Sequence, residues 1–340
     1  MNTALHRMSI VIDGHCDILM AISSGKSRLR NDMSPVGIGK KGSEIDELPA
    51  QYNLPQWSRG GITVQVCAIF LDDRQLVSPL RNSLEMVWWL NNEIHENPRL
   101  EMVLSVEDIL RIKQNDKVGL LLALEGLEPI EREPWLLDIF YKLGLRMAGL
   151  SHSRRNYYAD GSQWDVETGG LTMAGRSIIS RMNDLGIVID MAHLNQKGYW
   201  EVLELSKHPV IVSHSSPHKY YPDDPENDSA PRYPRQDTTN GRQRLDALAK
   251  NRGVFGVIFY RQKSLDAILD DIDFLLDRIG PEHVGLGSDY FGFLDAPQDF
   301  KTISQLSELT DGLLRRGLSD EIVEGILGKN YLRVFQEVWK

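Results

Sequence analysis

Apolar and polar positions divide the 340-residue chain into strand-like and helix-like segments that alternate. The strand-like segments are short and almost continuously apolar, which is typical of strands buried on both faces of a parallel sheet. They lie in residues 9–17, 61–71, 118–126, 145–152, 186–193, 208–215, 253–260 and 283–290. Eight buried strands that alternate with helices predict an α/β fold, a (β/α)8 TIM-type barrel.

The segments between these runs carry apolar residues at helical spacing. Helices are predicted over residues 83–97, 105–115, 171–186 and 264–280. Thr172 is a suitable N-cap, and Gly186 and Gly280 mark helix ends. A barrel alone needs about 250 residues, so the excess is assigned to inserted loops at 31–60 and 216–242 and to a helical C-terminal tail after Asp289. One domain is expected over residues 1–340.

The composition limits which kinds of molecule and which cellular compartment we expect for this protein. The net charge is −10, so we expect no binding to nucleic acid or to an anionic membrane surface, because both need clustered Lys and Arg. No apolar run reaches the ~18 residues of a membrane-spanning helix, and the opening MNTALHRMSI lacks the apolar core of a signal peptide. Two cysteines, Cys16 and Cys67, make no disulfide framework. These features favour a reduced, cytoplasmic compartment.

Ionisable side chains end most of the predicted strands. They are His15 and Asp17 after the first, then Glu125, His152, His193, His214 and Asp289. The C-terminal ends of barrel strands meet on the face that carries active sites, so these side chains should converge. Imidazoles suit zinc and similar metals, and carboxylates can bridge two ions. One histidine at a strand end is more often structural, but four of them with buried carboxylates predict a metal site.

The other histidines and several motif-like stretches receive an ordinary structural interpretation. The histidines are His6, His95, His208, His218 and His283. GIGKKG at 37–42 matches the dinucleotide glycine pattern but follows no strand and opens no helix. GLTMAGRS at 170–177 resembles a phosphate loop but has Arg176 where Lys is required. Neither a G-x-S-x-G elbow nor an H-E-x-x-H motif occurs in the sequence.

Six motifs, in order along nearly the whole chain, resemble the membrane dipeptidase (renal dipeptidase) family of metal-dependent amidohydrolase barrels. They are DGHCD, LEG, LSHS, IDMAH, VIVSHSS and GLGSD. The resemblance implies two zinc ions, a first bound by His15 and Asp17, a second bound by His193 and His214, and Glu125 bridging both. It also implies that Asp289 is the catalytic carboxylate and that the catalytic His152 contacts the scissile carbonyl of the substrate.

Three positions differ from the family pattern. Leu127 replaces the second glycine that usually follows the bridging glutamate, and Phe291 stands where a second aspartate is expected. The family also holds the substrate's carboxylate with an arginine. Arg235 in YPRQDTT is the best match for this substrate-binding role, with Arg232 as the runner-up. These departures concern substrate recognition and leave the predicted metal ligands intact.

The expected activity is zinc-dependent hydrolysis of dipeptides. A hydroxide that bridges two metal ions would attack the amide carbonyl, with Asp289 moving the proton and His152 stabilising the oxyanion. The resemblance adds tolerance of a D-residue at the C-terminal position and a possible homodimer. An alternative is a related enzyme acting on another small amide, a lactam or an N-acyl amino acid, which the loss of the second aspartate at Phe291 keeps open. A barrel that binds without catalysis is a third alternative.

Overall fold

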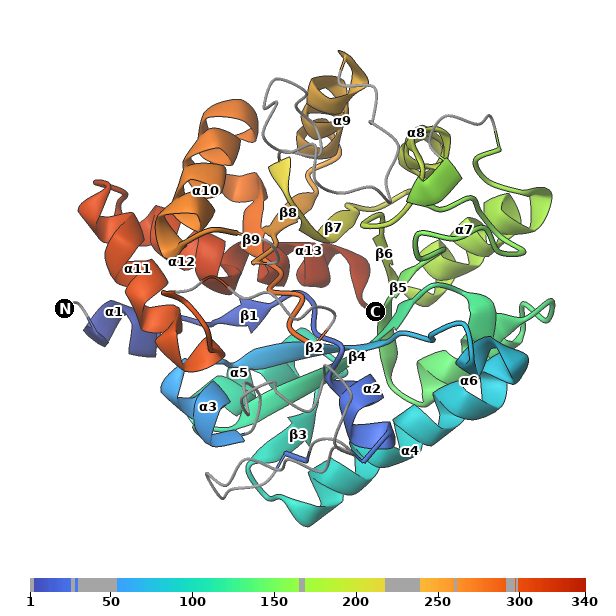
Figure 1. The fold of residues 1–340 in the computed structure, drawn as a ribbon, viewed down its shortest axis with the longest axis horizontal. Helices are drawn as coiled ribbons and strands as arrows, with labels where there is room; N and C mark the ends of the chain where they lie inside the picture. Colours follow the sequence, from blue (N-terminus) through green and yellow to red (C-terminus); the bar gives the residue numbers. More distant parts are fainter. Residues whose placement is uncertain are drawn as a thin grey trace.

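Parallel strands form a closed barrel at the centre of the fold (Figure 1). The computed structural model describes residues 3–25, 28–29, 54–164, 169–217, 239–259, 262–291, 297 and 299–340. The barrel strands are β1 (Ile12–Asp13), β2 (Val64–Ile69), β4 (Val118–Glu125), β5 (Leu145–Gly149), β6 (Val188–Asp190), β7 (Ile211–Ser215), β8 (Val254–Val257) and β9 (Val284–Leu286). The ring closes because β1 pairs in parallel with both β2 and β9, and β2 pairs with β4. The predicted barrel is therefore confirmed.

One short strand lies outside the ring. Strand β3 (Leu100–Met102) pairs in parallel with the start of β4, with Leu100 opposite Val118. The pairing of β4 with β5 begins only at Leu122, so the first residues of β4 have a free edge that β3 can occupy. The sequence pattern did not predict this strand, since three residues are too few to show a periodicity.

Helices surround the barrel and cover its outer face (Figure 1). They are α1 (Thr3–Met8), α2 (Ile18–Ser23), α3 (Leu54–Arg59), α4 (Pro79–Glu96), α5 (Val106–Gln114), α6 (Leu136–Lys142), α7 (Met173–Leu185), α8 (Gln196–Leu205), α9 (Thr239–Lys250) and α10 (Leu265–Ile279), followed by α11 (Leu306–Arg315), α12 (Asp320–Glu324) and α13 (Asn330–Val338) in the tail. Short 3-10 turns span Gln75–Val77, Glu128–Ile130, Ser162–Trp164, Pro281–His283 and Ile303–Gln305, and Gly325–Lys329 joins α12 to α13. The four predicted helices correspond to α4, α5, α7 and α10.

The predicted helix signals act as expected. The Thr172 side chain accepts a hydrogen bond from the Gly175 N–H (3.0 Å) at the start of α7. Gly186 ends that helix with a left-handed backbone, at a φ of 72°. Most of the two predicted inserted loops lies outside the described residues, although α3 belongs to the first and α9 begins in the second.

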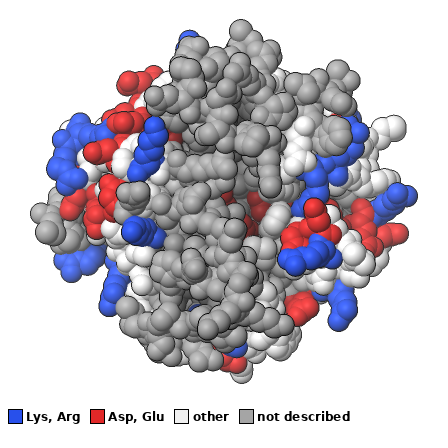
Figure 2. All heavy atoms as spheres, in the orientation of Figure 1, with Lys and Arg blue, Asp and Glu red and all other residues white. Residues whose placement is uncertain are grey.

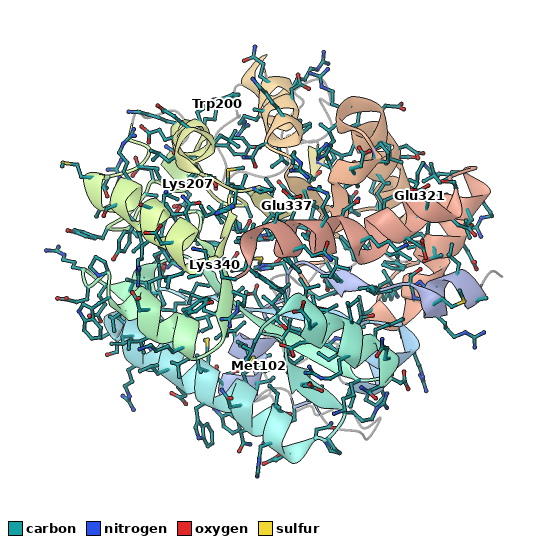
Figure 3. The ribbon with its side chains drawn as sticks, turned by 180° about the vertical axis from the view of Figure 1, so that it is seen from behind. Met102, Trp200, Lys207, Glu321, Glu337 and Lys340 are labelled. Carbon is teal, nitrogen blue, oxygen red and sulfur yellow. The ribbon has the colours of Figure 1, made fainter. Side chains whose placement is uncertain are left out.

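The C-terminal helix α13 closes one end of the barrel, and it crosses the strands in the view from behind (Figure 3). Its side chains Tyr331, Val334 and Phe335 are fully buried with residues of the barrel interior. The Tyr331 hydroxyl donates to the Ser213 carbonyl (3.2 Å), and Trp339 just beyond the helix donates to the Arg146 carbonyl (3.2 Å) at the start of β5. The helix therefore occupies the N-terminal ends of the strands and leaves the opposite end for polar residues.

Charged side chains of both signs share the surface. Figure 2 shows Lys and Arg interspersed with Asp and Glu on both sides of the face it presents, among the residues that are described. None of the helices in the described part of the chain is long and apolar enough to cross a membrane.

Candidate metal centre

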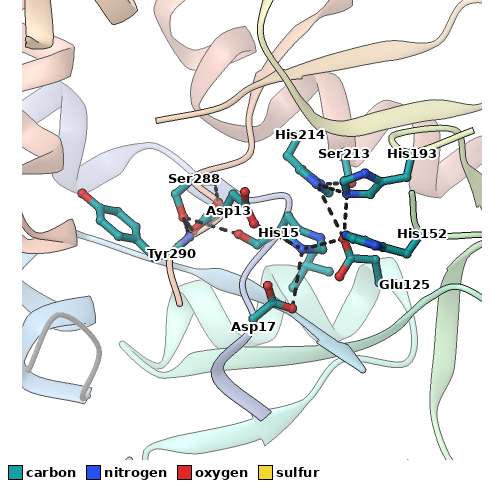
Figure 4. Close-up of polar contacts among 12 residues, drawn as sticks. Asp13, His15, Asp17, Glu125, His152, His193, Ser213, His214, Ser288 and Tyr290 are labelled. Atoms are coloured by element: carbon teal, nitrogen blue, oxygen red, sulfur yellow. Dashed lines mark hydrogen bonds and ion pairs between the residues drawn. The ribbon is translucent and has the colours of Figure 1, made fainter. Parts of the chain in front are cut away.

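The seven ionisable residues predicted from the strand ends come together at the C-terminal end of the barrel, and Figure 4 labels all of them except Asp289. His15 and Asp17 follow β1, Glu125 ends β4, and His214 lies in β7. His152, His193 and Asp289 lie in the loops that follow β5, β6 and β9. Parallel strands bring their C-terminal ends to one face, which is why residues up to 274 positions apart meet here.

Glu125 lies at the centre of the cluster. Its Oε1 atom is 2.8 Å from His193 Nε2, 3.7 Å from both His15 Nε2 and His214 Nε2, and 4.0 Å from His152 Nε2. One carboxylate oxygen therefore faces four imidazoles from four strands. This is the position expected of a carboxylate that serves two ions.

Three overlapping groups have the spacing of a metal site, with ligand atoms within 4.8 Å of one another. They are His15, Asp17 and Glu125; Glu125, His193 and His214; and His15, His214 and Asp289. The first two groups coincide with the two ligand sets implied by the family resemblance, and they share Glu125. Which side chains bind an ion stays a prediction.

The hydrogen-bonding pattern of these atoms is the one expected around a bound cation. Both ring nitrogens of His15 and Oδ1 of Asp17 are buried without a hydrogen-bond partner among the described residues. His193 Nε2 lies 2.8 Å from His214 Nε2 and equally close to Glu125 Oε1, so three lone-pair atoms crowd one another. Buried polar atoms are normally satisfied, because each unsatisfied atom costs roughly 1–3 kcal/mol. A divalent ion bound by nitrogen and oxygen ligands would satisfy them together.

Burial shifts the pKa values of the cluster in the direction that favours its neutral form. Burial raises the pKa of Asp17 well above the ordinary value, and the neighbouring Glu125 adds to that shift. Burial also raises the pKa of Glu125, and the carboxylates of Asp190 and Glu128 raise it further. Burial lowers the pKa of His15, so its imidazole stays neutral and able to bind a metal.

His152 and Asp289 are the members of the cluster most accessible to solvent. Their side chains are 22% and 14% exposed, whereas those of His15 and Glu125 are 1% and 7% exposed. The His152 ring packs against Phe70, with centroids 4.7 Å apart, and its Nδ1 lies 2.9 Å from the Ser153 hydroxyl. These two predicted catalytic residues therefore lie on the side from which a substrate can approach.

The backbone around Asp289 is left-handed. Asp289 has a φ of 61° and Phe291 a φ of 67°. Aspartate tolerates this region, but a bulky aromatic residue adopts it rarely. The departure at Phe291 therefore introduces backbone strain beside the site, where an aspartate would be better tolerated.

Two buried aspartate–serine pairs near the site were given no role by the sequence analysis. Asp13 accepts hydrogen bonds from the backbone N–H and hydroxyl of Ser288, at 2.8 and 2.6 Å. Asp190 accepts them from the same groups of Ser213, at 2.9 and 2.5 Å, and burial raises the pKa of Asp190 to about 6. Each serine directly precedes a cluster residue in VSHS or GSD, which is a signal that the sequence contains.

The sequence analysis predicted an arginine that binds the substrate's carboxylate. Arg235 and the runner-up Arg232 lie outside the described residues. Another arginine, Arg154, lies near His152 in the described part of the chain, and the sequence analysis gave it no role. Arg154 packs over the same Phe70 ring, contacts Asp73 (2.8 Å), and lies 3.4 Å from Glu128.

Comparisons with known proteins agree with the geometry. The family model described as "Membrane dipeptidase (Peptidase family M19)" matches residues 1–340. The dipeptidase verJ of Clonostachys rogersoniana is 31% identical over 277 residues, which cover 79% of this chain and 68% of that protein. The dipeptidase tcpJ of Claviceps purpurea is 31% identical over 71% of this chain but only 56% of its own length.

A solved structure shares the fold. It is a metallopeptidase from Rhodobacter sphaeroides bound to a phosphinate mimic of the dipeptide L-Ala-D-Ala. The TM-score is 0.81 at 23% identity, and the match covers 97% of this chain and all of that chain.

Proposed function

The chain belongs to the membrane dipeptidase family of metallopeptidases, and on this premise we propose that it is a zinc-dependent dipeptidase. It hydrolyses the peptide bond of free dipeptides and accepts a D-residue at the C-terminal position. The observation that carries the proposal is the buried cluster around Glu125, in which two ligand groups share one carboxylate. The D-residue is supported by the solved relative, whose ligand mimics L-Ala-D-Ala.

The proposed ligands are assigned from the grouping of the side chains. His15 and Asp17 would hold the first ion, His193 and His214 would hold the second, and Glu125 would serve both. Bound zinc would supply a Lewis acid for the scissile carbonyl and lower the pKa of a coordinated water to about 7. The mixture of imidazole and carboxylate ligands supports zinc over calcium or magnesium, which prefer oxygen alone.

Asp289 and His152 carry out the proton transfer and the charge stabilisation in this proposal. The Asp289 carboxylate takes a proton from the attacking water and delivers it to the nitrogen of the leaving amine. His152 Nε2 faces the cluster and donates a hydrogen bond to the carbonyl oxygen as negative charge develops there. The greater exposure of these two side chains supports roles in contact with the substrate.

A panel of L-L, L-D and D-D dipeptides, assayed together with elemental analysis of the same sample, tests the proposal. We expect turnover of L-L and L-D dipeptides by protein that contains zinc. Zinc-loaded protein without turnover on any dipeptide would contradict it.

Phe291 favours a second candidate, a related enzyme acting on a lactam or an N-acyl amino acid. Phe291 stands two positions after Asp289, so the carboxylate expected at that position is missing from this loop. Including one lactam and one N-acyl amino acid in the same panel separates the two activities by their kcat/KM values. The homodimer and the cytoplasmic location stay predictions, to be tested by sedimentation and by cell fractionation.

We assign the binding of the substrate's carboxylate to Arg235, because the geometry of a guanidinium group matches that of a carboxylate. Arg235→Ala should sharply lower kcat/KM for free dipeptides and have much less effect on dipeptides with an amidated C-terminus. Equal losses on both substrates would remove Arg235 from the site and direct attention to Arg232 or Arg242.

A further inference from the structure

We propose that Asp190 and Ser213 are positioning residues that hold His214 in one tautomer, with its proton on Nδ1 and the lone pair of Nε2 facing Glu125. This inference rests on the proposed function only in naming zinc as the group that Nε2 binds. The hydrogen bonds themselves run from the end of β6 through β7 to the metal centre, and Figure 4 shows Ser213 beside His214 at their inner end.

The series of hydrogen bonds begins at the carboxylate of Asp190, which accepts from several donors. Asp190 Oδ1 accepts from the backbone N–H groups of Ser213 (2.9 Å) and Ala192 (3.1 Å). Asp190 Oδ2 accepts from the Ser213 hydroxyl at 2.5 Å. The register of β6 and β7 contains a single pair, Asp190 opposite Ile211, and the Met191 N–H donates to the Ile211 carbonyl (2.8 Å). The side-chain bonds of Asp190 extend this contact as far as Ser213.

The direction of each bond follows from counting protons. A serine hydroxyl has one proton to donate and lone pairs that accept. Ser213 gives its proton to the Asp190 carboxylate, so it can only accept from His214 Nδ1, which lies 2.9 Å away. A neutral imidazole with its proton on Nδ1 has its lone pair on Nε2.

The position of His214 Nε2 explains why this tautomer matters. That atom lies 3.7 Å from Glu125 Oε1 and 2.8 Å from His193 Nε2, inside the proposed second ligand group. A metal-binding histidine commonly donates its other ring N–H to an acceptor, which selects the tautomer and orients the ring. Here the acceptor is a serine whose own orientation is set by a buried aspartate.

The second aspartate–serine pair offers a matched control. The Ser288 hydroxyl donates to Asp13 at 2.6 Å, and Ser213 and Ser288 are both fully buried. The two serines differ in their second neighbour. The Ser213 hydroxyl lies beside a histidine ring nitrogen, whereas the Ser288 hydroxyl lies 3.4 Å from the main-chain carbonyl oxygen of His15. Ser288→Ala therefore removes the same kind of bond without removing the acceptor of a histidine N–H.

Asp190→Asn gives the sharpest test, because it should reverse the donor-to-acceptor direction of both hydrogen bonds of the Ser213 hydroxyl. The amide oxygen must take the Oδ1 position, where two backbone N–H groups donate, so the amide NH2 faces the Ser213 hydroxyl. The hydroxyl then accepts from the amide and donates to His214 Nδ1. The ring is driven to carry its proton on Nε2, which blocks the proposed ligand atom.

Long-range ¹H–¹⁵N spectra of metal-free protein with ¹⁵N-labelled histidine report the tautomer directly. The His214 signals are assigned by their loss in His214→Asn. We expect the Nδ1–H form in the wild type and in Ser288→Ala, a mixture in Ser213→Ala, and the Nε2–H form in Asp190→Asn. An Nε2–H form in the wild type overturns the proposal without any variant, and so does an unchanged tautomer in a folded Ser213→Ala or Asp190→Asn protein.

Zinc affinity, measured by competition with a chromophoric chelator, provides the second readout. The affinity for the second ion should fall about 10- to 100-fold in Asp190→Asn and Ser213→Ala, as is usual when the partner of a metal-binding histidine is lost. Ser288→Ala should leave that affinity close to the wild-type value. If Asp190→Asn and Ser213→Ala lost no more zinc affinity than Ser288→Ala, the proposal would be contradicted. A correct tautomer in a protein that hydrolyses no dipeptide would instead overturn only the proposed function.

Discussion

At the scale of single residues, the centre of the cluster is a set of ionisable side chains that are almost completely buried. Glu125 and Asp17 are carboxyl groups whose pKa values burial raises, and they lie beside His15, whose pKa burial lowers. Such a set is unfavourable as an uncompensated group of anions and becomes favourable around a cation. The residues most exposed to solvent, His152 and Asp289, are those to which the proposal gives direct contact with the substrate.

Asp289→Asn separates proton transfer from metal binding. The amide keeps the shape of the side chain but cannot accept a proton, so kcat should fall by about 10²- to 10⁴-fold. Zinc content should stay close to normal, because both proposed ligand groups that contain Glu125 are intact. Steady-state kinetics and elemental analysis on one sample check this. A variant that keeps most of its kcat would show that another group moves the proton.

Glu125→Gln and His193→Ala should differ in how many ions they affect. Glu125 lies in both proposed ligand groups, whereas His193 lies in the second alone. Glu125→Gln is therefore expected to weaken both ions, and His193→Ala mainly one. Zinc titrations with the wild type as control measure this difference. A single ion in fully active wild-type protein would rule out the two-ion arrangement.

At the scale of elements, helix ends and their glycines set how the helices attach to the barrel. Gly186 ends α7 with a φ of 72° and leads directly into β6, which carries Asp190. A Cβ atom at Gly186 would lie 2.6 Å from the Val338 carbonyl oxygen at the end of α13. This glycine therefore serves both the turn and the close approach of the C-terminal helix.

Gly186→Ala should destabilise the protein more than Gly317→Ala. Gly317, which follows α11, also has a positive φ (87°), but a Cβ there meets no atom within 4 Å. The left-handed backbone alone costs roughly 1–2 kcal/mol for an L-residue, and this is the whole loss expected at Gly317. Gly186→Ala adds the clash with Val338. Urea unfolding of metal-loaded protein measures both losses, and equal values would show that α13 moves aside freely.

At the scale of the whole molecule, the fold separates stability from chemistry along the barrel axis. Helix α13 fills the N-terminal end with Tyr331, Val334 and Phe335. The opposite end holds the metal cluster and the two aspartate–serine pairs that tie β1 to β9 and β6 to β7. Both pairs act between neighbouring strands. Next to Asp13 and Ser288, backbone bonds from the Asp289 N–H to the His15 carbonyl (3.2 Å) and from the Asp17 N–H to the Tyr290 carbonyl (3.0 Å) also join the ends that carry the cluster.

Removing metal should lower the melting temperature, and by more at pH 7.5 than at pH 5. In the metal-free protein, the raised pKa values of Asp17 and Glu125 stabilise the fold when these groups are protonated, and this contribution is lost as pH rises through them. Zinc binds the ionised groups, so its stabilisation grows over the same range. Thermal unfolding with zinc and with chelator across this range measures the gap. A gap that narrows as pH rises would show that these carboxylates are not ligands.

The sequence by itself determined the barrel strands, four of the helices and the residues of the cluster. Continuous apolar runs identified the barrel strands, because a strand buried on both faces has no polar positions to alternate. The residues at the strand ends followed from that assignment, since parallel strands share one C-terminal face. The cap at Thr172 and the helix end at Gly186 were equally local signals.

Only the tertiary structure decided which of these side chains meet and at what distance. Periodicity depends on neighbours along the chain, so it could not place α13 over the barrel or add β3 to the edge of β4. The pairing of Asp13 with Ser288 joins residues 275 positions apart, and it exists because closure of the ring sets β1 beside β9. The central position of Glu125 depends on distances across the barrel, which closure of the ring creates. The hydrogen bonds from Asp190 through Ser213 to His214 depend on the pairing of the neighbouring strands β6 and β7.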